Sequence, residues 1–393
     1  MSAEVVNAYD QSVLLVGEAS WGVPPDPAAA QAIEMISLKT GPSERGNFRG
    51  KKDRNPGRGL QNAFVEGRVQ PIDFVAEASV KSRAAADTVP RETVLMKAAG
   101  LLETVNAATS VVYSLPADPL MSSTFVSASL YRILGKTPYV LAAEQLRGCL
   151  VKTLTFEGGD KELMIKAAGA GIGKYVSGYL PSVTFASGVD TAITCLAGGD
   201  IYYLQLGFYQ IESEIIKITA ISTTGNSFTA VRAQLGSTGA AHATKPIRPY
   251  QPSLTYAGSP VSEAVCSGTL DSIALEYLSF MVELTTGADH KPPESGSRYS
   301  QGAIFKRYDV KARFKALLRR EDVRFINKSV ATNSVPLSFV SGGTAGGIVT
   351  FSMPYCVIEP IEIPDSANDV VNVDVSVMVR DSAGNDALTI AYT

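Results

Sequence analysis

The sequence predicts a mainly β protein, and three observations lead to that prediction. Apolar and polar residues alternate with period two along much of the chain, which is typical of strands that bury one face. The 34 glycines and 21 prolines are dispersed, as expected for many turns between short strands. A single stretch, residues 90–105, carries its apolar residues at helical spacing. We therefore expect packed sheets with one flanking α-helix.

The expected strands are spread over the whole chain. Period-two alternation covers residues 31–39, 63–81, 150–156, 304–314 and 347–357. In the second of these segments, Pro71 is expected at a β-bulge that shifts the phase of the alternation. Valine at every second position from Val371 to Val379 predicts a further strand, and turn-forming residues at 381–386 lead into residues 387–392. We expect the chain to end in a hairpin.

The helical segment has apolar residues at positions i, i+1, i+4, i+7, i+8 and i+11, counted from Val94. They form one stripe along a helix. Pro90 and Glu92 suit the N-terminus of that helix. An amphipathic helix at about residues 90–105 would cover one face of a sheet.

The middle of the chain changes character and indicates an inserted module. Two strand-like segments, 211–218 and 227–234, flank the turn-forming residues 222–226. Because exposed turns tolerate insertion, a module whose ends meet on a host domain is expected here. The predicted parts are residues 1–186 and 252–393 of the host fold and an inserted β module at 187–251.

Composition limits the function classes. The formal net charge of -3 and the pI near 5.6 give no general attraction to nucleic acid or to an anionic membrane. No apolar run approaches the roughly 18 residues that cross a bilayer, and the N-terminus lacks the order of a signal peptide. We expect a soluble product made in a cytoplasm.

The sequence predicts no catalytic site, no cofactor site and no metal site. The two histidines, His242 and His290, lie in glycine-, alanine- or proline-rich surroundings and are expected at the surface. Glu212 and Glu214 share one face of an expected strand and are predicted to be solvated. Four cysteines lie far apart without a C-x-x-C pair, so buried free thiols are expected at Cys149, Cys195, Cys266 and Cys356.

The glycine-rich residues 167–174, AAGAGIGK, invite comparison with a phosphate-binding loop. A Walker loop requires glycine where Ala168 stands and a hydroxyl residue where Tyr175 stands. The glycines also miss the spacing of a dinucleotide-binding motif. We expect a glycine-softened strand end.

The order of several segments resembles a known family. A long glycine-rich basic loop precedes the strand pair at 61–81, and the helix PRETVLMKAAGLL follows from Pro90. Together with residues 252–393, these features resemble the tail tube (major tail) proteins of long-tailed bacteriophages, over residues 1–184 and 252–393. Residues 212–219 and 231–242 are similar to a small β-module that recurs in phage tail and hub proteins.

The resemblance implies a two-sheet sandwich or barrel flanked by a helix. Six copies would form a ring, each giving four strands to one inter-subunit β-barrel, and rings would stack into the tube through which the genome leaves. The implied partners are the tail terminator, the tape measure and the distal tail or baseplate proteins, with DNA only in transit. The protein would be a non-enzymatic virion component, assembled in the host cytoplasm.

Two groups of residues acquire roles from the resemblance. A long loop between early strands would contact the adjacent ring. The alternative interpretation is a flexible loop exposed to solvent. The expected inter-ring contact residues are Arg45, Phe48, Arg49, Lys51, Lys52, Arg54 and Arg58. The expected lumen-facing residues are Glu66, Gln70, Asp73 and Glu77. The polar face of residues 304–314 carries Arg307, Lys311 and Arg313 beside Asp309. Either this strand presents its charges to a subunit interface, or the wall of the channel has mixed charge.

Two other functions compete with the tail tube. A tail hub or baseplate ring subunit would account for the hub-like insert. A glycan-binding surface β-protein would use the insert as its binding module. The aromatic residues available there are Tyr202, Tyr203, Phe208 and Tyr209, and Trp21 is the one tryptophan of the chain.

Overall fold

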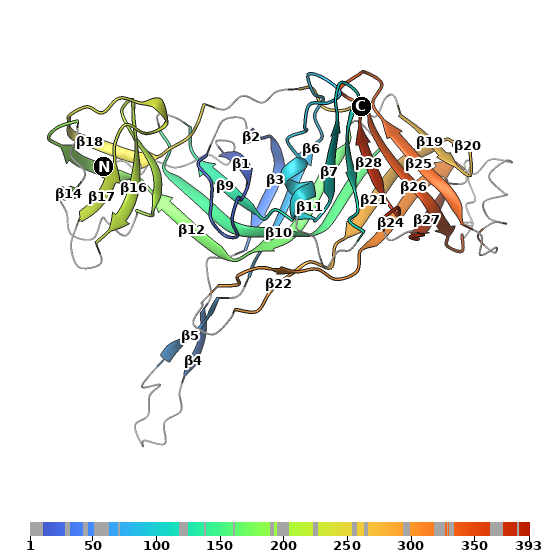
Figure 1. Cartoon of the computed structure of the whole chain (residues 1–393), viewed down its shortest axis with the longest axis horizontal. Helices are drawn as coiled ribbons and strands as arrows, with labels where there is room; N and C mark the ends of the chain where they lie inside the picture. The colour runs from blue at the N-terminus through green and yellow to red at the C-terminus, as the bar shows by residue number, and fades with distance from the viewer. Residues whose placement is uncertain are drawn as a thin grey trace, which may run out of the picture.

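One strand organises the body of the molecule (Figure 1). β10 (Ala142–Gly158) is 17 residues long, and its two halves belong to two different sheets. Its first half pairs with β9 and β12, and its second half pairs with β11 and β21. The computed structural model describes residues 11–27, 32–41, 46–50, 63–69, 71–117, 125–136, 139–159, 162–188, 192–194, 204–222, 227–253, 258–262, 266–293, 299–317, 327, 329, 334–361, 372–382 and 385–393.

The larger sheet, called the long sheet below, is antiparallel throughout. Its strands follow the order β3-β6-β11-β10-β21-β24-β27-β26-β25-β19-β20, and β28, β8 and β7 continue it from β26. Their bounds are β3 (Met35–Thr40), β6 (Ile72–Ser79), β11 (Met164–Gly171), β21 (Tyr277–Thr285), β24 (Asp309–Leu317), β27 (Asn372–Val379), β26 (Val349–Ile358), β25 (Val335–Ser341), β19 (Cys266–Leu270), β20 (Ile273–Leu275), β28 (Thr389–Tyr392), β8 (Ser110–Ser114) and β7 (Leu102–Asn106). The prediction of a mainly β fold is confirmed, and the structure adds that its sheets are large and antiparallel.

The smaller sheet shares β10 with the long sheet. Its order is β2-β1-β9-β10-β12, with β1 (Gln11–Gly17), β2 (Ala32–Ile33), β9 (Ala128–Leu134) and β12 (Gly173–Gly178). The main core lies on the inner face of both sheets and includes Leu15, Phe74, Phe156, Phe314 and Phe351. Alternation along each strand thus sends every second side chain into one core.

The helix is shorter than predicted. α1 spans Thr93–Ala98 and buries Leu95, Met96 and Ala98 against the core. The chain then turns at Gly100, whose φ of +82° is left-handed, and continues as strand β7 instead of a second helical half. An added Cβ at Gly100 would come within 2.7 Å of the Tyr308 hydroxyl. The first residues of the predicted apolar stripe are buried on the helix, but its last residues, Leu102 and Val105, belong to strand β7.

The predicted C-terminal hairpin is wrong. β27 and β28 do not pair with each other but follow one another along the same edge of β26. Val377 lies opposite Ile358, and Tyr392 lies opposite Val349 at the other end of β26. β27 and β28 therefore lie in line with each other, because both pair with the same edge of β26.

A six-stranded sheet at one end of the molecule forms a separate module (Figure 1). Its order is β13-β18-β15-β16-β17-β14, with β13 (Leu180–Phe185), β14 (Ala192–Thr194), β15 (Gly207–Ile211), β16 (Glu214–Ile221), β17 (Ser227–Val231) and β18 (His242–Pro249), and a 3-10 turn η4 spans Gln234–Gly236. It has its own core, which includes Phe185, Tyr209 and Phe228. The predicted hairpin is present as β16 and β17, and the sheet begins at Leu180, ahead of the boundary expected at residue 187.

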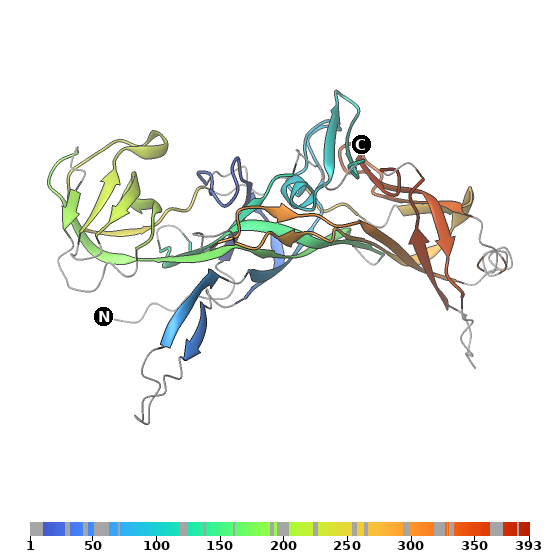
Figure 2. The same cartoon turned by 60° about the horizontal axis from the view of Figure 1, so that its bottom comes forward.

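A two-stranded arm projects from the body beside the module (Figures 1 and 2). It consists of β4 (Gly46–Gly50) and β5 (Ala63–Val69), which pair only with each other among the described residues. The expected continuous strand pair at 63–81 is therefore divided, because β5 belongs to the arm and β6 to the long sheet. Pro71 stands at this joint and not at a bulge within one sheet.

Two hairpins of the long sheet share one plan. β3 and β6 are adjacent, and the arm lies between them in sequence. β21 and β24 are also adjacent, and a long excursion with β22 (Asp289–His290) and β23 (Ala303–Ile304) lies between them.

None of the helices in the described part of the chain is long and apolar enough to cross a membrane.

Candidate assembly surface

The side of the long sheet opposite the core is a polar surface, called the outer face below. It extends over seven adjacent strands, from β3 to β27. Period-two alternation places its residues at every second position of each strand. Its basic residues are Lys39, Lys166, Lys311, Arg313 and Lys315, and its acidic residues are Asp73, Glu77, Glu157, Glu283, Asp309 and Asp374.

Opposite charges face one another across neighbouring strands of this outer face. Glu77 of β6 lies opposite Lys166 of β11, and Glu283 of β21 lies opposite Lys311 of β24. Directly opposed residues in antiparallel strands have Cβ atoms about 5 Å apart, so their charges compensate locally. Five basic and six acidic side chains thus share one surface of mixed sign.

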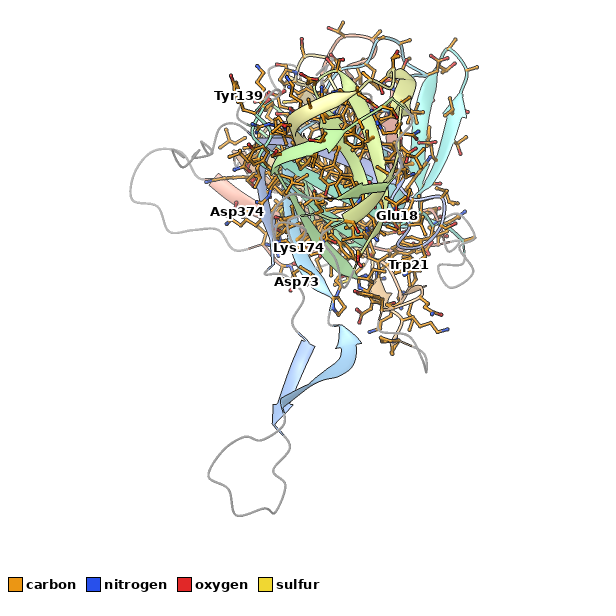
Figure 3. The ribbon with its side chains drawn as sticks, turned by 90° about the vertical axis from the view of Figure 1, so that its left-hand side faces the viewer. Glu18, Trp21, Asp73, Tyr139, Lys174 and Asp374 are labelled. Carbon is orange, nitrogen blue, oxygen red and sulfur yellow. The ribbon has the colours of Figure 1, made fainter. Side chains whose placement is uncertain are left out.

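The expected lumen-facing residues are divided between two sheets. Asp73 and Glu77 lie together on the outer face of β6, and Glu77 Oε2 accepts a hydrogen bond from Ser37 Oγ at 3.0 Å. Glu66 lies on β5 in the arm, and Gln70 lies outside the described residues. Figure 3 shows Asp73 beside the base of the arm, and Asp374 on the other side of the body from Glu18 and Trp21.

The arm carries the expected inter-ring contact residues only in part within the described chain. Phe48 lies opposite Val65 and Arg49 opposite Phe64 in the β4–β5 ladder. The other residues of this set, Arg45, Lys51, Lys52, Arg54 and Arg58, lie outside the described residues. The projecting arm nevertheless gives the basic segment a defined base, because β4 leads directly into it.

Both ends of the seven-strand row expose backbone hydrogen-bonding groups. β3 pairs with β6, and its other edge has no strand partner in the part of the chain that the structure describes. At the opposite end, β27 pairs with β24 along Asn372–Met378 but with β26 only through Val377–Val379. Such edges are templates for pairing with another chain.

The glycine-rich segment at 167–174 is part of the sheets and serves packing. An added Cβ at Gly169 would lie 1.9 Å from the Leu150 carbonyl oxygen of β10, so only glycine allows this close approach. Lys174 Nζ forms an ion pair with Glu144 at 3.0 Å and donates to the Gly41 carbonyl at 2.9 Å. This lysine holds β12 against β10 and β3, and the expectation of a strand end is confirmed.

Glu144 is the centre of a buried polar cluster. It accepts hydrogen bonds from Thr40 of β3, Arg132 of β9 and Lys174 of β12. Burial alone would raise the pKa of Glu144, but these three donors hold it below its ordinary value. The carboxylate therefore ties four strands of both sheets together.

The module contains a second buried cluster, called the clasp below. Arg232 forms a bidentate pair with Glu214, at 2.7 and 2.6 Å, and its guanidinium lies over the Phe185 ring. His242 places Nε2 2.8 Å from Glu214 and Nδ1 2.8 Å from Glu212. Burial alone would raise the pKa of Glu214, but hydrogen bonds from Arg232, His242 and two backbone amides lower it to about 2.

The clasp corrects two surface predictions. His242 and Glu214 are buried, and only Glu212, in the turn before β16, remains half exposed. The two glutamates do not share a solvated strand face, because Glu212 has a left-handed φ of +51° and belongs to the turn. A lone charged residue is costly to bury, but a carboxylate with several donors is not.

His290 is also buried, contrary to its predicted surface position. Its Nε2 lies 3.1 Å from the Gly148 carbonyl, and its ring packs edge-on against Trp21 at 5.8 Å. Burial lowers the pKa of His290. Glu18 accepts hydrogen bonds from the Gly22 and Gly148 amides at 2.8 and 2.9 Å, which anchors the same loop (Figure 3).

The cysteine prediction holds for two residues. Cys149 and Cys356 are buried free thiols, and burial raises the pKa of both. Cys266 is exposed, because it stands at the start of β19, and Cys195 lies outside the described residues. Within the described chain, no group of three histidine, cysteine or acidic residues is arranged to hold a metal ion.

No protein-family model matches the sequence, and no curated protein matches it. The architecture and its surfaces are therefore the grounds for a functional proposal.

Proposed function

We propose that the protein is a structural subunit of a tail tube, the hollow conduit of a phage virion. The observation that supports this proposal best is the row of seven antiparallel strands from β3 to β27, buried on one face and charged on the other. Such a row has the construction of one segment of a large barrel wall.

In this proposal the ring closes through the two edges of this row that lack a strand partner among the described residues. The free edge of β3 and the free part of β27 lie at opposite ends of the row. Head-to-tail joining of identical copies pairs these edges, and a closed ring leaves none exposed. The polar outer face then lines the channel.

The charge pattern of the outer face suits a conduit for DNA. A basic wall would exchange counterions for phosphates and hold the duplex. In this face, acidic residues oppose basic ones directly, as Glu283 opposes Lys311 and Asp374 opposes Lys315. The mixed-sign wall, one of the two alternatives left open by the sequence, is the one we propose, and DNA is a partner only in transit.

The number of subunits per ring follows from the number of strands each contributes. Six subunits were expected from four strands each. The row that ends at the two free edges contains β3, β6, β11 and β10 and then β21, β24 and β27. Three subunits of seven strands would supply nearly as many strands as six subunits of four. The mass of an isolated ring of 41.5 kDa chains distinguishes the two.

The arm provides the contact between stacked rings in this proposal. It projects from the body beside Asp73, at the rim of the outer face (Figure 3). Its base is a paired ladder, and its basic segment reaches carboxylates of the next ring, where arginine can pair bidentately. Terminator, tape measure and distal tail proteins would contact the tube at its ends and in its channel.

Negative-stain imaging of the purified chain tests the proposal. Stacked rings with a central hole are expected at high protein concentration. Single rings that never stack would support the tail hub or baseplate alternative. A monodisperse monomer under all conditions, seen by light scattering, would contradict both.

A further inference from the structure

A cleft of about 380 Å³ lies between the smaller sheet and the module. Its floor is the face of β9, β10 and β12 that points away from the main core. Its other wall comes from β15 and β16 of the module and from residues 249–250. Neither part of the molecule forms this cleft alone, and its size is that of a small-molecule site.

Three residues on adjacent strands form a row across the floor. Tyr131 of β9 lies opposite Gln145 of β10, which lies opposite Tyr175 of β12. Neighbouring strands are about 4.8 Å apart, so the two tyrosines stand about 10 Å apart with an amide between them. Arg147 lies over the Tyr175 ring at 3.9 Å and bonds Gln145 Oε1 through Nε at 3.1 Å, which fixes the positions of both.

The module supplies a third aromatic ring and a lysine that links the two walls of the cleft. Phe208 lines the cleft, and Lys217 lies over its ring at 4.8 Å. The same Lys217 Nζ lies 3.3 Å from Asp26 Oδ1 in the loop of the body. This ion pair joins the two walls and leaves the lysine charge compensated.

The chemistry of the lining selects one class of ligand. Aromatic rings offer apolar faces, while Gln145, Gln205, Ser177 and Tyr250 offer amide and hydroxyl groups. Of the two cationic side chains in the lining, Lys217 is paired with Asp26, and the Arg147 guanidinium is engaged with the Tyr175 ring and with Gln145 Oε1, so neither is directed at a ligand alone. A ligand with apolar C–H faces and a rim of hydroxyl groups matches this lining.

We propose that this cleft binds a neutral saccharide unit, which stacks on Tyr175 and Phe208 and bonds Gln145. The site goes beyond the tube function and does not depend on it. It also differs from an insert that binds by itself, because half of the cleft belongs to the body.

Binding is tested on the full chain with a panel of neutral oligosaccharides and immobilised neutral polysaccharides. Isothermal titration then measures the affinity of the saccharide retained most strongly. Removing a stacking ring or the amide is expected to weaken binding about tenfold for Tyr175→Ala, Phe208→Ala and Gln145→Ala. Preference for the free oligosaccharide or for the polymer identifies the source of the ligand.

Two controls separate the site from general effects. Tyr175→Phe keeps the ring and should bind within about twofold of the wild type. Tyr355→Ala removes an exposed tyrosine of β26 outside the cleft and should leave affinity unchanged. Circular dichroism checks that each variant is folded. Absence of binding to any neutral saccharide, or full binding by both Tyr175→Ala and Phe208→Ala, would overturn the proposal.

Discussion

Glu77 of β6 lies directly opposite Lys166 of β11 on the outer face of the long sheet. Charge compensation of this kind predicts that an acid-to-base change converts the wall into a DNA-binding surface. The double variant Glu77→Lys, Glu283→Lys should make assembled particles retain short duplex DNA at low salt, with retention falling steeply as salt rises. Filter binding measures this, and Ser213→Lys in the module is the control. Equal retention by wild-type particles would contradict a conduit role.

The free edge of β3 predicts a variant that cannot close a ring. Ile36 is the residue at the register shift of β3 and is 56% exposed. A lysine on an edge strand blocks pairing with another strand, so Ile36→Lys should give folded subunits that do not form rings. Light scattering and imaging measure the assembly state. Val231→Lys, at a similarly exposed site in the module, should assemble normally.

The arm predicts a defect in stacking alone. Reversing Arg49, Lys51, Lys52 and Arg54 to glutamate should leave subunits folded and able to form rings, but not long tubes. The reason is that the reversed charges repel the carboxylates of the next ring. Changing the two arginines to lysine is the matched control and should preserve tubes. Normal tube length in the reversed variant would exclude the inter-ring role.

The module predicts an outer decoration. Its sheet begins at Leu180 and ends at Pro249, so a deletion should remove residues 180–249 and join the flanking chain through a short glycine-serine linker. Tubes of this variant should have a thinner wall and the same bore, measured by electron microscopy. If the bore widened, the module would line the channel.

The clasp predicts stability that depends on pH. Single changes that remove one partner of the buried Arg232–Glu214 pair, Arg232→Met or Glu214→Gln, should destabilise the module by about 3–5 kcal/mol. Because hydrogen bonds lower the pKa of Glu214 to about 2, the wild-type contribution is complete above the ordinary value of 4.5. It is lost as pH falls toward 2. Hydrogen exchange of residues 180–249, measured as a function of urea concentration and pH, reports the stability loss of the variants and the pH dependence of the wild type.

A double variant provides the control for the clasp. Arg232→Met combined with Glu214→Gln removes both charges, so its loss of stability should be smaller than the sum of the single losses. Additive losses would show that the two side chains act independently and would contradict the clasp.

Period-two alternation located strands because it depends on burial of one face, which each strand records locally. Residues 347–357 were expected as a strand and are observed as β26, Val349–Ile358. Pairing partners were not predictable in the same way. The turn at 381–386 has hairpin composition, but long-range pairing of β27 and β28 with β26 decides the topology.

The buried polar clusters were missed because a charged residue is, by itself, more stable in water. Glu214 is buried because Arg232, directly after β17, and His242 of β18 both bond its carboxylate, 18 and 28 residues along the chain. The helix was overextended for a related reason. Apolar spacing continues through Leu102, but the left-handed turn at Gly100 redirects the chain into a strand. The pattern Gly-Leu-Leu after Ala99 was the available signal for that ending.

The continuity of β10 has a mechanical consequence. The module follows directly from β12, which is hydrogen-bonded to the first half of β10, while the second half of β10 runs between β11 and β21. A pull on the module along the strand direction therefore loads a single backbone that crosses the whole body. The ladders on both sides of β10 resist together in shear, so tension is shared by the entire fold.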